Sequence, residues 1–411
     1  MRALLRDPRF RAFWLGQATS VVGNGITLVA VAALVIPARG GEIYGLVLAA
    51  ESATMAVLLL GSGVVVDRYS RTAVMAVADV SRGAGVVGLL LLARSGPLPL
   101  LLLASALVGA GVALHQPAHR AALPQLVGPD DLRRANALDT ATMRLGMGAG
   151  TALGGVLVAV WGARHAILVD LVTFAASLIT LLWLRLPPVG ERTPGGGLRQ
   201  ALHEARDGVT EVRRRPWAAV VMLQGTAQVL CLFAPAFALI PVVALDRYGS
   251  SAYGWFMMSG FVGSVLGSAL VARTSPRRPG LSAMNALAPC CLLPLVLVVD
   301  LPLVAFCAVN LVSWVGIGWF SVLWFSALQT EFPPAVQGRV FSLESLATFG
   351  LEPIALALTP ALAAAVGVGP VAIVAAAVML ISTYAVFLVP GVTTFGSAGA
   401  SPTAEPATAT A

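Results

Sequence analysis

The sequence predicts an all-α membrane protein in which twelve transmembrane helices form two pseudo-symmetric six-helix bundles. Three observations predict this fold: a scarcity of charge, apolar runs along the whole chain, and a local pattern that repeats halfway along it. Of the 411 residues, 58% are hydrophobic and 11% are charged, and the mean hydropathy is +0.87. Soluble domains carry about 25% charged residues because water surrounds them. Lipid must therefore cover most of this protein.

Twelve apolar segments are long enough to cross a hydrocarbon core of about 30 Å, which takes about 20 helical residues. Backbone groups in lipid must hydrogen-bond within their own segment, so we expect these segments to be helices. The predicted spans are residues 10–36, 42–66, 72–93, 98–120, 137–160, 164–186, 218–245, 251–272, 281–299, 301–327, 340–365 and 368–390.

A polar interruption divides the predicted spans into two halves. Residues 1–186 are predicted to form an N-terminal six-helix bundle, and residues 218–390 a C-terminal one. The interruption, residues 187–217, contains prolines and glycines, followed by a charged stretch whose apolar residues recur at helical spacing. It predicts a cytoplasmic linker with an amphipathic helix on the membrane surface; a regulatory or partner-binding role is the alternative. The tail, residues 391–411, is rich in Ala, Thr, Ser and Pro and is predicted to be disordered.

The arginines predict the orientation, since the chain has no lysine. A cytoplasmic N-terminus places most of them on the cytoplasmic side, as the positive-inside rule requires. Both termini are then cytoplasmic, and we expect a monomeric multi-pass protein of a bacterial cell membrane. The arginines form no stripe beside stacking aromatic residues, so we expect no binding of nucleic acid.

The two halves repeat a local pattern. Tyr44-Gly45 opens the second predicted span, and Tyr253-Gly254 opens the eighth, 209 residues later. Internal duplication in a membrane protein is typical of a transporter whose substrate site lies between the repeats.

The turn between the second and third spans combines glycine, acid and base: Gly63, Asp67, Arg68 and Arg71. Acids and arginines at helix termini can pair with each other and with the helix ends. This pattern predicts a latch that breaks when the two halves rock apart; the alternative is simple anchoring by the two arginines.

The fifth span is rich in glycine. Gly146, Gly150 and Gly154 fall on one helical face, one turn apart, and Gly155 follows directly. Missing side chains allow another helix to approach closely. Static packing and a sliding gate both need such a face, and both interpretations stay open.

These motifs resemble those of the major facilitator superfamily, over residues 1–390 and in the branch that contains macrolide and enterobactin exporters. The turn at 63–71 resembles that family's motif, with Ser70 in place of a glycine and Thr72 in place of a basic residue. The stretch 146–155 resembles the fifth-span motif of exporters, with Thr151 in place of a proline. The remaining matching segments are 78–82, 117–136, 169–174 and 338–342.

The resemblance implies alternating access by two six-helix bundles, with spans 1, 4, 7 and 10 lining the cavity. The candidates for the cavity on these spans are Gln17, Asn24, Gln224, Gln228, Asn310, Trp314 and Trp319. Amides and indoles suit an amphiphilic substrate, because aromatic faces take its apolar area while a few polar groups orient it. The alternative is that the tryptophans face lipid or pack within the bundle.

Inserting an ionisable side chain into a bilayer costs about 2.5–3.5 kcal/mol of free energy, so each such residue needs a structural or functional explanation. Asp79, Arg82 and Arg144 are predicted to form an intramembrane charge network, in which Asp79 and Arg82 pair with each other or, alternatively, with Arg144 across helices. Glu51 and Glu352 have no partner nearby in the sequence, and a buried carboxylate without a partner can load and release a proton. These two are therefore the predicted proton-coupling residues.

Three other ionisable residues receive a structural interpretation from the sequence. Asp170, a few turns into the sixth span, is interpreted as a structural cap. His115 and His119, one turn apart near the end of the fourth span, are interpreted as a solvated helix end rather than a metal site.

The sequence and its resemblance together predict an antiporter: a proton-coupled exporter of a small amphiphilic molecule such as a drug, an antibiotic or a siderophore. An importer of the same fold is one alternative. A polytopic membrane enzyme, such as a lipid-group transferase, is another, but the adjacent acids Asp130 and Asp131 suit a helix cap. Without lysine there is no ATP-binding P-loop, and neither the histidines nor the cysteines have metal-ligand spacing. We expect no enzymatic activity, cofactor or metal.

Overall fold

The computed structural model describes residues 6–186, 209–274 and 276–397, and within these ranges the regular structure is helical. Eleven of the described helices are long and apolar enough to cross a membrane. The first of them, Pro8–Leu59, has 52 residues, or about 78 Å at 1.5 Å per residue. That is more than twice a hydrocarbon core of about 30 Å, so this segment supplies two crossings. The predicted all-α membrane fold is confirmed.

The long first helix, α1 (Pro8–Arg68), turns back on itself at Gly40, whose φ of 82° and ψ of 170° are not helical. Phe10 near its start and Val66 near its end lie in the same buried cluster. Both ends of α1 therefore lie at one end of the molecule, and Gly40 lies at the other.

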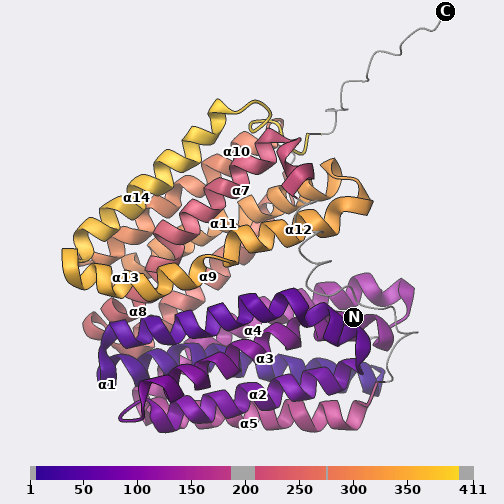
Figure 1. Ribbon diagram of the computed structural model, residues 1–411, viewed down its shortest axis with the longest axis vertical. Helices are drawn as coiled ribbons and strands as arrows, with labels where there is room; N and C mark the ends of the chain where they lie inside the picture. Colours follow the sequence, from indigo (N-terminus) through magenta and orange to yellow (C-terminus); the bar gives the residue numbers. More distant parts are fainter. Residues whose placement is uncertain (1–5, 187–208, 275, 398–411) are drawn as a thin grey trace, which may run out of the picture.

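Figure 1 shows two groups of helices, one above the other. The lower group, the N-terminal bundle, contains α1, α2 (Arg71–Leu92), α3 (Leu98–Leu126), α4 (Pro129–Trp161) and α5 (Ala163–Leu184). The upper group, the C-terminal bundle, contains α7 (Pro216–Gln228), α8 (Ala234–Arg247), α9 (Gly249–Val271), α10 (Pro279–Leu287), α11 (Leu303–Glu331), α12 (Pro334–Phe349), α13 (Glu352–Val366) and α14 (Val368–Ala385).

Two crossings of the C-terminal bundle change their helix type within the membrane-crossing segment. A π-helical turn, Val229–Phe233, joins α7 to α8. A 3₁₀ segment, Ala288–Leu297, continues α10. Such mid-span changes in helical hydrogen bonding often mark hinges or functional positions.

Four short turns require glycine because their φ is positive: Gly40, Gly162, Gly249 and Gly367. Gly249 follows Gly40 by 209 residues, the same spacing that separates the two Tyr-Gly pairs. We call the end of the molecule that carries these turns the glycine-turn end, and the opposite end, where Arg68 lies, the arginine-rich end.

The two bundles meet mainly through α4 against α9 and through α1 against α13 and α8. Gly45 on α1 approaches Pro360 of α13, and Gly155 on α4 approaches Gly254 of α9. The glycines at these contacts allow helix backbones to come close together. Because these residues lie near the glycine turns, the bundles are joined firmly in that half of the molecule.

Residues 121–136, which lie between the predicted spans 98–120 and 137–160, are mostly helical. Helix α3 continues to Leu126 through Pro117 and Pro124, and α4 already begins at Pro129. Alanine-rich flanks favour helix strongly enough to continue it past the prolines.

The structure also differs from the predicted disordered tail at residues 391–397. Phe395 stacks on Trp217, with ring centroids 5.3 Å apart, Val392 is fully buried, and the Gly396 amide donates to Glu331. We call residues 389–397 the C-terminal strap. Burial of its apolar side chains outweighs its polar composition. The remaining tail, residues 398–411, and most of the predicted linker helix lie outside the described residues.

Candidate functional site

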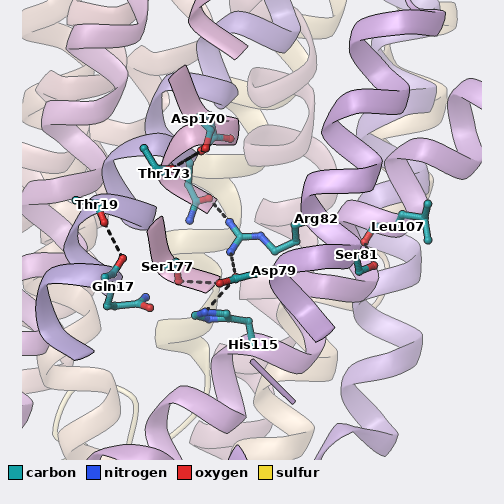
Figure 2. Close-up of polar contacts among 12 residues, drawn as sticks. Gln17, Thr19, Asp79, Ser81, Arg82, Leu107, His115, Asp170, Thr173 and Ser177 are labelled. Atoms are coloured by element: carbon teal, nitrogen blue, oxygen red, sulfur yellow. Dashed lines mark hydrogen bonds and ion pairs between the residues drawn. The ribbon is translucent and has the colours of Figure 1, made fainter. Parts of the chain in front are cut away.

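A cluster of charged and polar side chains lies inside the N-terminal bundle (Figure 2). Asp79 and Arg82, one turn apart on α2, form an ion pair at 3.6 Å, and both side chains are buried. Ser177 on α5 donates a hydrogen bond of 2.7 Å to Asp79, and Arg82 donates to Asn24 on α1. The predicted pairing of Asp79 with Arg82 is present in the structure, and three helices converge on it.

Two residues that the sequence assigned to structural roles belong to this cluster. Asp170 on α5 is fully buried and accepts hydrogen bonds from Thr27 and Thr173. His115 on α3 is also buried, and its Nε2 atom lies 3.5 Å from Asp79 Oδ1. The interpretation of His115 and His119 as a solvated helix end was wrong, since both are buried, and Asp170 caps no exposed helix end. Helix α3 carries His115 inward because that face of the helix packs against α2 and α1.

Arg144 does not join the Asp79–Arg82 pair. It lies on the face of α4 that meets the C-terminal bundle, where it donates a hydrogen bond to Ser264 of α9. The predicted three-membered charge network therefore divides into a pair inside one bundle and an arginine at the boundary between the bundles.

A cavity of about 280 Å³ opens beside the cluster. Its polar lining residues are Gln17, Asn24, Thr27, Glu51, Arg82, His115, Gln116 and Asp170. Two predicted cavity residues, Gln17 and Asn24, are in this lining, as is the predicted proton-coupling residue Glu51. In the part of the chain that the structure describes, Glu51 makes no hydrogen bond or ion pair. Its carboxyl group is therefore the least compensated one in this cavity.

The C-terminal bundle contains a larger cavity, of about 380 Å³, with a different lining. Its aromatic lining residues are Phe233, Phe237, Trp314, Phe320, Trp324, Phe325 and Phe349, and its polar ones are Gln224, Gln228, Ser321, Glu344, Thr348 and Glu352. Small-molecule sites are typically apolar and aromatic, with a few polar groups that orient the ligand. This cavity has that composition.

The two glutamines of this cavity differ in their hydrogen bonding. Gln228 donates to Ser382 and Thr383 of α14, at 3.1 and 3.0 Å. Gln224 is buried, and neither atom of its amide has a hydrogen-bond partner among the described residues. Buried amides are normally satisfied, so Gln224 is the group in this lining that is free to bind a ligand.

The remaining predicted cavity residues divide between lining and packing. Trp314 lines the larger cavity, whereas Trp319 donates from its indole to Ser282 of α10 and is not among the lining residues. Asn310 binds the Phe256 carbonyl at 2.6 Å and so fastens α11 to α9; it lines only an adjoining pocket of about 60 Å³.

Glu352 connects the larger cavity to the boundary between the bundles. It lines the cavity at the start of α13, and one of its carboxylate oxygens accepts a hydrogen bond of 3.4 Å from Ser52 on α1. Ser52 directly follows Glu51, which lines the other cavity. One predicted proton-coupling residue, Glu352, thus takes part in this contact between the bundles, and the other, Glu51, is the chain neighbour of its partner Ser52.

The glycine face of α4 packs within its own bundle. A Cβ atom added at Gly150 would lie 2.2 Å from the Val22 carbonyl oxygen of α1, and one at Gly154 would lie 2.8 Å from Ile26 Cα. Gly146 faces the same helix, through Val21. Gly155 points the other way, toward Ser250 and Gly254 of α9. The three glycines on one face therefore seat α4 on α1, and Gly155 forms part of the joint between the bundles.

In the turn at 63–71, the surroundings of Gly63 and the side chain of Asp67 lie outside the described residues. Arg71 is buried and donates to the carbonyl groups of Val66 and Tyr69. Arg68 is exposed. These two hydrogen bonds lie within the turn, so they hold its shape.

Ser70 and Thr72, which replace the glycine and the basic residue of the family motif, make hydrogen bonds to the chain at the end of α5. Ser70 donates to the Leu186 carbonyl at 2.6 Å, and Thr72 accepts from the Leu186 amide at 3.1 Å. A glycine and a basic residue would make neither hydrogen bond. These two residues fasten the start of α2 to the end of α5.

The sequence matches the family model described as Major Facilitator Superfamily over residues 13–351. It is 27% identical over 377 residues to "Multidrug efflux pump Tap" of Mycolicibacterium fortuitum, a match that covers 85% of this chain and 88% of that protein. It is 22% identical over 247 residues to "Macrolide efflux protein A" of Streptococcus pyogenes, covering 59% of this chain and 60% of that protein. The match thus spans three fifths of the macrolide efflux protein.

Solved structures share the same fold. A POT family transporter in complex with 5-aminolevulinic acid superposes with a TM-score of 0.72 at 10% identity, covering 92% of this chain and 95% of that one. A bacterial homologue of the iron transporter ferroportin, in an inward-facing state, has a TM-score of 0.69 at 20% identity, covering 92% and 97%. At these identities the likeness concerns the fold alone.

Proposed function

Because this chain belongs to the Major Facilitator Superfamily, we propose that it is a proton-coupled exporter of small amphiphilic molecules, such as a drug, an antibiotic or a siderophore. Family membership makes it a secondary transporter embedded in a membrane. It also excludes the alternative of a membrane enzyme, since the family consists of transporters.

The observation that carries the proposal is the contrast between the two cavities. One is aromatic and contains an amide without a hydrogen-bond partner among the described residues, Gln224. The other is polar and contains a carboxyl group, Glu51, that makes no hydrogen bond or ion pair with the described residues. Aromatic faces bind the apolar part of an amphiphile, and the amide orients its polar part. A carboxyl group inside a bilayer can carry a proton. Substrate binding is thus assigned to the C-terminal bundle, whereas the two proposed proton-binding carboxyl groups, Glu51 and Glu352, belong one to each bundle.

The contact between Ser52 and Glu352 supplies the coupling in this proposal. It joins the bundle that holds Glu51 to the bundle that holds the aromatic cavity. When Glu352 takes up a proton, the hydrogen bond that its carboxylate accepts from Ser52 weakens, because a charged acceptor binds more strongly than a neutral one. The bundles then separate more readily at this boundary, which is what alternating access requires.

Efflux is favoured over import by the drug-efflux relatives, one of which aligns over most of both chains. The distribution of arginines favours a cell-membrane orientation in which the arginine-rich end and both termini are cytoplasmic. In this orientation the joint at the glycine-turn end lies on the outer side, which supports loading of substrate from the cytoplasm.

Everted membrane vesicles that contain the protein test the proposal, with ethidium as a lipophilic fluorescent probe. An imposed proton gradient should drive dye accumulation in the vesicles, and Glu51→Gln or Glu352→Gln should reduce it at equal protein level. Accumulation that persists after a protonophore has collapsed the gradient would contradict proton drive. Uptake into right-side-out vesicles instead would favour the importer.

A further inference from the structure

A line of ionisable side chains leads out of the polar cavity of the N-terminal bundle toward the arginine-rich end. It begins at Asp79, which lies beside the cavity but is not among its lining residues. It continues through His115, which lines the cavity, and His119, both on α3, and ends at Asp139 on α4. His119 Nε2 lies 2.8 Å from Asp139 Oδ1, and His115 Nε2 lies 3.5 Å from Asp79 Oδ1. The two imidazole rings are stacked, with centroids 6.1 Å apart and planes 9° from parallel.

Exposure to solvent changes stepwise along this line. The Asp139 side chain is 20% exposed, and those of His119 and His115 are 6% each, while that of Asp79 is fully buried. Phe13 also stacks on His119, with ring centroids 5.0 Å apart, and so shields this imidazole from water. The line therefore connects a water-accessible carboxylate to the interior of the bundle through groups that bulk water barely reaches.

A purely structural cluster would satisfy its polar atoms, because each unsatisfied buried polar group costs free energy. Among the buried polar atoms that lack a hydrogen-bond partner in the described part of the chain, three belong to this line: Asp79 Oδ1, His115 Nε2 and His119 Nδ1. A proton that moves along the line needs polar atoms with unused hydrogen-bonding capacity, and these atoms have it.

We propose that Asp79, His115, His119 and Asp139 form a proton pathway between the polar cavity and the arginine-rich end. The proposal rests on the proposed proton coupling and extends it, since it assigns the route by which the proton leaves. The charged groups that face the inner end of the route are Arg82 from α2, Glu51 from α1 and Asp170 from α5, all in the lining of the cavity.

The transfer balances with one proton in and one out. The protonated Asp79 carboxyl group gives its proton to His115 Nε2, and His115 releases its Nδ1 proton to a water molecule that must enter beside the stacked rings. That water passes a proton to His119 Nδ1. His119 then releases the Nε2 proton that it shares with Asp139, and the Asp139 carboxyl group loses it to bulk water. Histidine suits this role because its two nitrogens can accept and donate a proton in turn.

Substitutions along the route should slow net proton movement without abolishing substrate binding. His119→Gln and His115→Gln should reduce gradient-driven ethidium accumulation in everted vesicles by about tenfold or more, the range expected when a proton-transfer group is lost. Asp139→Asn, a change near the surface, should have a smaller effect in the same direction. His165→Gln is the matched control, because His165 is exposed on α5 at the glycine-turn end.

Two further measurements separate a proton pathway from a structural role. Exchange of labelled for unlabelled dye across vesicles without a gradient needs no net proton movement, and it should keep the wild-type rate in His119→Gln. In His119→Ala, added imidazole should restore gradient-driven accumulation. Wild-type accumulation in all three route variants would overturn the pathway, as would loss of exchange in both histidine variants together with normal accumulation in Asp139→Asn. If the wild-type protein itself ignores the gradient, the proposed function fails instead.

Discussion

Ser52 of α1 donates a hydrogen bond of 3.4 Å to Glu352 of α13, across the boundary between the two bundles. The local sequence does not predict this contact, because 300 positions separate the two residues. The contact lies between a polar cavity on one side and an aromatic cavity on the other. A change in the protonation of Glu352 would therefore change the strength of a hydrogen bond that joins the two bundles.

Ser52→Ala should loosen the boundary. Loss of one hydrogen bond to a charged group costs about 1.5–3 kcal/mol, which corresponds to a shift of about tenfold or more in an open–closed equilibrium. A single cysteine placed at Ser250, at the joint beside Gly155, should react faster with an impermeant maleimide in this variant. Thr54→Ala is the control, because Thr54 bonds only to the Ala50 carbonyl of its own helix. Equal labelling rates in both variants would contradict the assignment.

Gly150→Ala should destabilise the N-terminal bundle. The added Cβ atom would lie 2.2 Å from the Val22 carbonyl oxygen, so α1 and α4 would have to move apart, at a cost of about 1–3 kcal/mol. Thermal unfolding of the purified protein in detergent measures the effect as a lower Tm. Gly83→Ala in α2 is the matched control, since its added Cβ meets nothing within 4 Å and alanine favours helix. Equal Tm values for the two variants would show that the glycine face does not seat α4 on α1.

Gln224→Leu should raise stability and lower transport at the same time. The amide of Gln224 is buried without a partner in the described structure, so replacing it with an apolar side chain removes a desolvation cost of about 1–3 kcal/mol. The same change removes the polar group that we assign to the substrate. Gln228→Leu should lower the Tm, because it leaves two hydroxyl groups without their donor. A lower Tm in Gln224→Leu would show that the amide is satisfied in the working protein.

Removal of the C-terminal strap should destabilise the C-terminal bundle. A chain that ends at residue 388 loses the burial of Val392 and Phe395, worth about 1.5–3 kcal/mol for each side chain. Its Tm should fall by several degrees, whereas a chain that ends at Ser397 keeps the strap and should match the full-length protein. Identical unfolding of both truncated chains would mean that the strap is dispensable.

The sequence predicted the spans well because membrane crossing leaves a strong signal: long apolar runs bounded by glycine turns and arginines. It also predicted the Asp79–Arg82 pair, since residues three apart on a helix face each other. These features depend on local spacing alone.

The sequence failed where the answer depends on which helix faces meet. Nothing local shows that Arg144 points to Ser264 in the other bundle, or that Trp319 packs on α10 while Trp314 lines a cavity. Asp170 and His115 were missed for the same reason, because helices far apart in the chain bring them to Asp79. Two signals in the sequence could have found them. Both are ionisable residues within predicted membrane spans, where water does not solvate them, and His115 lies on the same helix face as His119.

Gly40 has consequences for modifying the protein. An added Cβ atom there would meet nothing within 4 Å, so volume is not the constraint. Its φ of 82° and ψ of 170° fall in a region that is essentially closed to all other residues. Any single replacement is therefore strained, whereas a few inserted residues would let the corner adopt ordinary dihedral angles. Lengthening the chain at this corner should be milder than mutating it, which makes Gly40 a suitable position for an inserted epitope that reports which side of the membrane this corner faces.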